Sequence, residues 1–183
     1  YLGDLMTAGF ICRNFTWSLK TGKPSRLSHY RLSDNYIRFY LKYIQPSMDR
    51  IERGQFQNIS LSSLSGLDVF MGYQFENLVL KNRDLIIHAL GIRSEEIVTE
   101  NPFFQRKTKE QEGCQIDYLI QTRSQNLFVC EFKFKRRPLN MEIIEEMQGK
   151  ISRFFYPRVF GIAPVLFHLS DVSDKVYDEN YFY

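Results

Sequence analysis

The stretch Val129 to Pro138, VCEFKFKRRP, constrains the fold more than any other part of this chain. Every second residue from Glu131 to Arg137 is charged, while Cys130, Phe132 and Phe134 between them are apolar. Successive side chains of a strand point to opposite faces, so the alternation predicts a strand with one charged and one apolar face. The single acid among these cations either neutralises its neighbours or ligates a metal ion.

Patterns along the rest of the chain predict an α/β fold. A helix ending at Gly9 is followed by two short strands and by two helices that end at Pro46 and Gly54. The remainder predicts the order helix, strand, strand, strand, helix, strand. The predicted ranges are strands 10–15 and 29–32, helices 34–46 and 48–53, a long helix 67–90, strands 95–104, 113–122 and 126–135, a helix 139–156 and a buried strand 159–170.

Four aromatic residues share one face of the predicted helix 34–46. Tyr36, Phe39, Tyr40 and Tyr43 recur at helical spacing. A stripe of this kind packs into a core more often than it stacks on nucleic-acid bases, and core packing is the interpretation that we favour.

Composition excludes few classes of protein. The 183 residues contain 44% hydrophobic residues, which is enough for a packed core, and the net charge of +3 does not by itself indicate nucleic-acid binding. Three widely spaced cysteines are expected to be reduced thiols in a cytoplasmic protein. No apolar run reaches the roughly 18 residues of a membrane helix. The chain starts in mid-pattern and without Met, as a piece of a longer protein would.

Two acids lie on the arms of the predicted hairpin. Asp117 has Ile116 and Tyr118 as neighbours, and Glu131 is flanked in the same way by apolar residues. Two acids on adjacent, largely buried strands need a cation or hydrogen-bond donors to stay ionised. Lys133, roughly 6.8 Å further along the strand on the face of Glu131, either neutralises the pair or assists a metal-bound water. Carboxylate oxygens suit Mg²⁺, or Mn²⁺ in its place.

Two further polar residues lie beside apolar helix faces. Glu76, in GYQFENLVL, is either a surface residue or a third acid of the site, and Gln148 is either a polar edge residue or a group that binds water or phosphate. Lys135, Arg136 and Arg137 follow the predicted strand. They are either a solvated charge run or contacts to a phosphate backbone.

The ordered set of these residues resembles the PD-(D/E)XK nuclease superfamily. The segments GYQFENLV, CQIDYLIQ, FVCEFKFK and EMQGKI place Glu76, Asp117, Glu131, Lys133 and Gln148 in the family's order. The resemblance implies a restriction-endonuclease-like core, a mixed four-stranded sheet flanked by helices. It also implies that Asp117, Glu131 and Glu76 hold the metal and that the substrate is nucleic acid, with DNA favoured. Ile116 stands where the family's name has Pro.

A second resemblance covers nearly the whole chain. Together with these strands, YLGDLMTAGFI, YRLSDNYIRFYLKYIQP and MGYQFENLV look like the C-terminal half of archaeal-type AAA+ ATPases. This implies that residues 1–33 end a winged-helix domain, 34–66 form a helical linker and 67–183 form the nuclease-like domain, with the ATPase upstream. No Gly-rich phosphate loop is present, so no nucleotide site is predicted.

Two functions follow from these resemblances. One is a metal-dependent nuclease, and the other is a module that binds nucleic acid or docks a protein for the attached ATPase without cutting. The upstream ATPase and nucleic acid are the expected partners, no membrane is expected, and self-association is left open.

Overall fold

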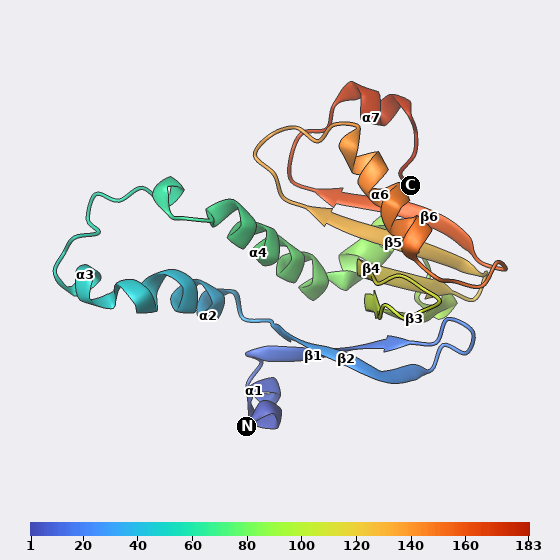
Figure 1. Cartoon of the computed structure of the whole chain (residues 1–183), viewed down its shortest axis with the longest axis horizontal. Helices are drawn as coiled ribbons and strands as arrows, with labels where there is room; N and C mark the ends of the chain where they lie inside the picture. The colour runs from blue at the N-terminus through green and yellow to red at the C-terminus, as the bar shows by residue number, and fades with distance from the viewer.

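The computed structural model describes all 183 residues and is an α/β structure with a four-stranded mixed sheet and a separate two-stranded sheet. Figure 1 shows the two-stranded sheet below the larger one, and an arm from α2 to α4 that extends away from both. The helices are α1 (Leu2–Thr7), α2 (Asn35–Phe39), α3 (Met48–Glu52), α4 (Leu67–Lys81), α5 (Arg83–Ala89), α6 (Glu142–Arg153) and α7 (Asp174–Asp178), and the strands are β1 (Ile11–Trp17), β2 (Pro24–Leu32), β3 (Ile97–Gln105), β4 (Cys114–Thr122), β5 (Asn126–Lys133) and β6 (Gly161–His168).

The larger sheet has the order β3-β4-β5-β6, in which β5 and β6 are parallel and the other pairs antiparallel. The predicted hairpin of β4 and β5 and the helix that connects β5 to β6 are confirmed. The prediction of a buried final strand is wrong, because β6 lies at an edge of the sheet and only Val165 in it is fully buried. Pro164 cannot donate a ladder hydrogen bond, which is why proline in a sheet is confined to such edges.

The predicted long helix 67–90 is two helices. It breaks at Asn82, whose backbone angles of φ −117° and ψ 42° are not helical, and its side-chain Nδ2 donates to the Leu78 carbonyl at 2.7 Å. An Asn side chain competes with the backbone for helix hydrogen bonds and therefore favours helix ends. The predicted end at Gly91 is confirmed, with φ +64° in the left-handed region that glycine adopts without strain.

The prediction that Pro46 ends the preceding helix is wrong. The chain widens into a π-helical turn over Tyr40–Ile44, tightens into a 3₁₀ turn over Gln45–Ser47 and continues as α3. Pro46 lies at the start of the 3₁₀ turn, where its missing N–H is not needed.

The aromatic stripe of this arm packs only in part. The rings of Phe39 and Tyr43 contact Phe70 of α4 edge-on, at centroid distances of 5.8 and 5.2 Å. Tyr36 is 67% exposed. The predicted core packing therefore applies to the two residues that face α4.

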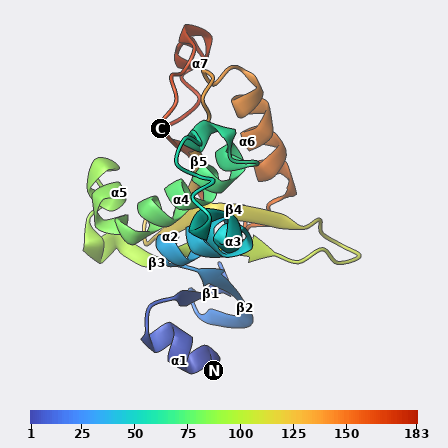
Figure 2. The same ribbon diagram turned by 90° about the vertical axis from the view of Figure 1, so that its left-hand side faces the viewer.

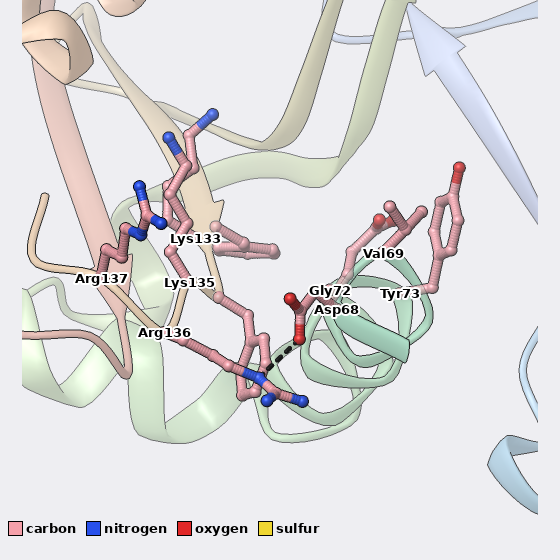
Figure 3. A pocket seen from close by; sticks show the side chains of 11 residues that line it. Asp68, Val69, Gly72, Tyr73, Lys133, Lys135, Arg136 and Arg137 are labelled. Carbon is pink, nitrogen blue, oxygen red and sulfur yellow. Dashed lines mark ion pairs between the residues drawn. The ribbon is translucent and has the colours of Figure 1, made fainter. Parts of the chain in front are cut away.

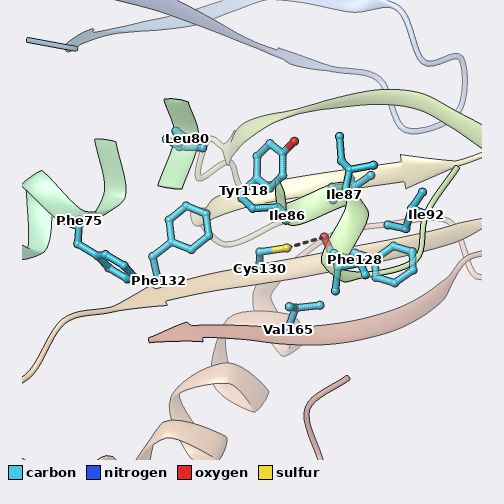
Figure 4. Close-up of a cluster of buried hydrophobic side chains, with 12 residues drawn as sticks. Phe75, Leu80, Ile86, Ile87, Ile92, Tyr118, Phe128, Cys130, Phe132 and Val165 are labelled. Atoms are coloured by element: carbon cyan, nitrogen blue, oxygen red, sulfur yellow. Dashed lines mark hydrogen bonds between the residues drawn. The ribbon is translucent and has the colours of Figure 1, made fainter. Parts of the chain in front are cut away.

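The side chains of β5 alternate between two hydrophobic clusters, as its sequence predicts. Cys130 and Phe132 pack with Phe75 of α4 and with the buried isoleucines of α5 (Figure 4). On the opposite face, Val129 packs with Met147 of α6. Figure 2 shows α5 and α6 on opposite sides of the molecule. Glu131 and Lys133 belong to the face that α6 covers, since both form ion pairs with this helix.

The β1–β2 hairpin shares a core with the larger sheet. Trp17 and Leu19 are buried in the cluster that contains Leu119 and Met147. Gln121 of β4 joins the two sheets, because its Oε1 accepts from the Trp17 indole at 2.7 Å and its Nε2 donates to the Leu19 carbonyl at 2.9 Å. The hairpin within residues 1–33 is thus packed against residues 67–183. The division into three domains itself stays a prediction.

The start of α2 provides a test of the arm. Of the two cap candidates in the sequence, Ser33 and Asp34, the N-cap is Asp34, whose Oδ1 accepts from the Ile37 N–H at 2.7 Å. We expect Asp34→Ala to lower the free energy of unfolding by about 1 kcal/mol. Chemical denaturation measures the change, with Asp49→Ala in α3, whose side chain caps nothing, as the control. Equal effects of the two substitutions would contradict the assignment of the cap.

None of the helices combines the length and the apolar character that crossing a membrane requires.

Candidate active site

Two acids from neighbouring strands form the centre of the site. The antiparallel register pairs Tyr118 with Cys130, so that Asp117 and Glu131, one residue further along, lie opposite each other. The Phe132 N–H donates to the Asp117 Oδ2 at 2.9 Å. The two side chains are only 19% and 10% exposed. The sheet therefore holds two carboxylates side by side in a largely dehydrated place, as the sequence predicts.

Lys150 of α6 provides a cation for both acids. Its Nζ forms an ion pair with the Glu131 Oε2 and lies 3.9 Å from the Asp117 Oδ1. The lysine side chain is itself only 16% exposed. The two carboxylates thus converge on one positively charged group. The sequence interpretation missed Lys150, although its spacing of three residues from the buried Met147 indicates a position beside the packed face of α6.

Lys133 lies between two acids. Its Nζ is 3.0 Å from the Glu131 Oε1 and 2.6 Å from the Glu146 Oε2. Burial lowers the pKa of Lys133, but the bonds to Glu146 and Glu131 outweigh it, so the pKa lies above its ordinary value. Glu146 was not predicted from the sequence. It lies one turn before Lys150 on α6. The two residues form ion pairs with β5, Glu146 with Lys133 and Lys150 with Glu131.

We call Asp117, Glu131, Lys133, Glu146 and Lys150 the charge cluster. Within it, the pKa of Asp117 is raised to about 6. Burial is the main cause and the charge of Glu131 adds to it, whereas Lys150 and the bond from the Phe132 N–H act in the opposite direction. The ionised form of Asp117 is therefore less favourable in the folded chain than in the unfolded one, because the folded pKa exceeds the ordinary value of 3.8.

This sign predicts how stability depends on pH. Folding becomes less favourable as the pH rises from about 4 to 6, because the folded chain then binds more protons than the unfolded one. Asp117→Asn, which keeps an acceptor for the Phe132 N–H, should raise the free energy of unfolding at pH 7 by about 1–2 kcal/mol in metal-free buffer and change little at pH 4. Urea denaturation across this range measures the effect. Asp171→Asn on the surface is the control, and a loss of stability at pH 7 would contradict the prediction.

The donor set fits a divalent ion held by few protein ligands. No group of three or more His, Cys, Asp or Glu side chains is arranged to hold a metal, so such an ion would have the two carboxylates of Asp117 and Glu131 as its side-chain ligands. Mg²⁺ is commonly bound by one or two carboxylates and keeps several waters. Both acids contact the ammonium group of Lys150. A positive charge is therefore stabilised between the two carboxylates.

Glu76, the predicted third acid, lies near this pair without bonding to it. It is half-buried on α4, and its carboxylate forms no ion pair and no hydrogen bond with the protein. Burial raises its pKa; Arg31 and Arg38 lower it, and Glu131 raises it further. Glu76 is therefore close enough to be affected by the charges of the charge cluster. It is not placed to bind the same metal ion as Asp117 and Glu131.

Gln148 lies on the exposed part of α6, and its side chain makes no hydrogen bond with the acids. The buried Ile144 lies one helical turn before it, whereas Glu146 and Lys150 follow the face that meets β5. The role in binding water or phosphate that we predict for Gln148 stays a prediction.

A basic cavity adjoins the charge cluster. It has a volume of about 720 Å³ and lies between the first turns of α4 and the end of β5. Glu76 and Lys133 line it together with the predicted basic residues Lys135, Arg136 and Arg137. Figure 3 shows these cations on one side and Asp68, Val69 and Tyr73 of α4 on the other, with the Arg136 side chain directed toward Asp68.

The three predicted basic residues differ in the ion pairs and hydrogen bonds that they form within the chain. Arg136 forms an ion pair with Asp68, its Nε 2.7 Å from the Oδ1. The backbone of Lys135 is fixed by Ser170, whose Oγ accepts from the Lys135 N–H at 2.8 Å. The side chains of Lys135 and Arg137 form no ion pair within the chain. These two cations are therefore available to a ligand.

Comparison with known proteins adds no assignment, because neither a family model nor a curated protein nor a solved structure matches this chain.

Proposed function

We propose that this chain is a metal-dependent nuclease with a restriction-endonuclease-like core, which hydrolyses phosphodiester bonds of nucleic acid, with DNA as the favoured substrate. The observation that carries the proposal is the convergence of Asp117 and Glu131 on one cation, with Lys133 bonded to the same glutamate. The order of elements around the four-stranded sheet agrees with the fold that the family resemblance implies.

The residues have separate roles in this reaction. Asp117 and Glu131 would hold Mg²⁺ or Mn²⁺, which when bound lowers the pKa of a water ligand and withdraws charge from a phosphate. Lys133 orients the attacking water and stabilises the charge that develops on the phosphate oxygens. Lys135 and Arg137, which no acid neutralises, contact the backbone of the strand. Glu76 completes the acidic lining between the metal position and the basic cavity.

A second candidate function is a module that binds nucleic acid, or docks a protein, without cutting. The observation that favours it is that Lys133 and Lys150 already compensate the acids. A charge cluster that is balanced in this way folds without a divalent ion. In both cases we propose that the chain serves an ATPase in the same polypeptide, as the resemblance implies.

Cleavage and binding assays separate the two functions. The chain is incubated with supercoiled plasmid and with single-stranded DNA in Mg²⁺, in Mn²⁺ and in excess chelator. The nuclease proposal expects cuts with either metal and none with chelator. DNA that is bound but stays intact under all conditions would leave the non-cutting module as the function.

A further inference from the structure

A second cavity lies between the β1–β2 hairpin, α2, α4 and β3. It has a volume of about 290 Å³, and Arg31, Arg38 and Asn77 are among the residues that line it. Tyr73 and Glu76 line this cavity as well as the basic cavity. The two cavities therefore adjoin at these two side chains of α4.

Two arginines in its wall have buried donors without acceptors. The Nε and Nη1 of Arg31 and the Nε of Arg38 are inaccessible to solvent and have no hydrogen-bond partner. Neither guanidinium forms an ion pair with a carboxylate, and the one bond from Arg38 runs to the Leu32 carbonyl at 2.6 Å. Buried polar groups are nearly always satisfied, and a charged group without a partner is especially unfavourable. The Glu76 carboxylate acts on both charges from a distance, and Arg38 lies over the Tyr73 ring, but none of these three nitrogens has an acceptor within hydrogen-bond distance.

The position of the two guanidinium groups is fixed by the fold. Arg31 is in β2, opposite Cys12 of β1. Arg38 is in α2, which Asn35 joins to α4 through a bond from the Asn77 Nδ2 to its Oδ1 at 2.9 Å. Asn77 is fully buried and its own Oδ1 has no partner. A preformed pair of guanidinium groups is suited to oxyanions with several acceptor oxygens.

We propose that this second cavity binds a phosphate group of the nucleic-acid strand that is cut at the neighbouring acid pair. The proposal rests on the nuclease function for the identity of the strand, but not for the binding of phosphate. Arg31 and Arg38 donate to the phosphate oxygens once their guanidinium groups turn toward the cavity, because three of their nitrogens are inaccessible in the free chain. Glu76 lines the same cavity, and its single negative charge is outnumbered by the two guanidinium groups. The strand would pass over Tyr73 from one cavity to the other.

Calorimetric titration with inorganic phosphate tests the cavity directly. We expect the wild-type chain to bind phosphate and Arg31→Gln to bind it at least about tenfold more weakly, because a charge-assisted bond to a buried site is lost. Arg53→Gln, an exposed arginine outside the cavity, should bind as the wild type does. Phosphate that binds equally well to Arg31→Gln, or not at all to the wild type, would overturn the proposal.

Two further arms make the result specific. If circular dichroism shows that Arg31→Gln is unfolded, Arg31→Lys replaces it; it keeps the charge but loses the forked donors, and weaker binding is again expected. Oligonucleotides with and without a 5′-phosphate identify the source of the group. A preference for the phosphorylated strand that Arg31→Gln removes indicates a terminal phosphate, and an equal loss on both strands indicates a backbone phosphate.

The failure of this inference differs from the failure of the nuclease function. A chain that binds phosphate through Arg31 but cuts nothing refutes the nuclease alone. A chain that cuts DNA, and whose Arg31→Gln variant binds phosphate normally, refutes the second cavity alone.

Discussion

Lys133→Ala is expected to lower the rate of metal-dependent DNA cleavage by a factor of about 100 to 1000 while the affinity for DNA changes little. Removal of one group that stabilises developing charge typically has an effect of this size. The ammonium of Lys133 is held between Glu131 and Glu146, so its position is fixed before substrate binds. Single-turnover cleavage of a labelled duplex measures the rate, and fluorescence anisotropy measures the affinity.

Two other variants serve as comparisons for Lys133→Ala. Lys20→Ala, an exposed lysine of the hairpin loop, should cut at the wild-type rate. Arg137→Ala should show the opposite pattern to Lys133→Ala, with weaker binding and a smaller dependence of the affinity on salt. If Lys133→Ala cuts at the wild-type rate, or if its slower cleavage is fully explained by weaker binding, Lys133 has no role in the chemical step.

Lys150→Met should lower the free energy of unfolding by about 3 kcal/mol in metal-free buffer. The removal of one partner from a buried ion pair leaves the other charge uncompensated, which is usually more harmful than the loss of the pair as a whole. Here two carboxylates lose the cation on which they converge. Met fills nearly the same space as Lys, so the lower free energy of unfolding measures the loss of the charge and not a change in packing. Urea denaturation measures it.

Magnesium should restore much of this stability. An ion that binds only the folded chain stabilises it by about 2.7 kcal/mol at 100 times its dissociation constant. We expect Lys150→Met to gain more from Mg²⁺ than the wild-type chain, because the ammonium group of Lys150 no longer competes for the carboxylates. Lys175→Met in α7, an exposed position, controls for the loss of a lysine. If Lys150→Met is destabilised and Mg²⁺ does not help it, the acids do not hold the ion.

The parts of the fold that the sequence predicts are those that local patterns decide. The alternation around Glu131 identifies β5 and its two faces, and Gly91 identifies the end of α5. The irregularities within the helices could not be predicted from local patterns. Asn82 breaks a helix whose periodicity continues on both sides, and Pro46 is accommodated by a π-helical turn that no sequence pattern indicates.

In the candidate site, too, some residues could be predicted from local patterns and others could not. Asp117 and Glu131 are paired by strand register, which the hairpin pattern predicts. Glu146 and Lys150 have the composition of ordinary surface residues, and only the packing of α6 on the sheet brings them to Lys133 and Glu131. The buried donors of Arg31 and Arg38 depend on contacts between segments far apart in the chain. Such contacts leave no local pattern in the sequence.

Under the proposed nuclease function, the charge cluster implies an order in which the metal and the strand bind. Its three acids and two lysines carry a formal charge of −1 when all are ionised, so a phosphate that approaches the metal-free site is repelled or unaffected. A bound divalent ion changes this sum to +1 and attracts the same phosphate. The metal would therefore bind before the strand, and the occupancy of the ion, not the affinity of the basic cavity alone, would control when a backbone enters the site.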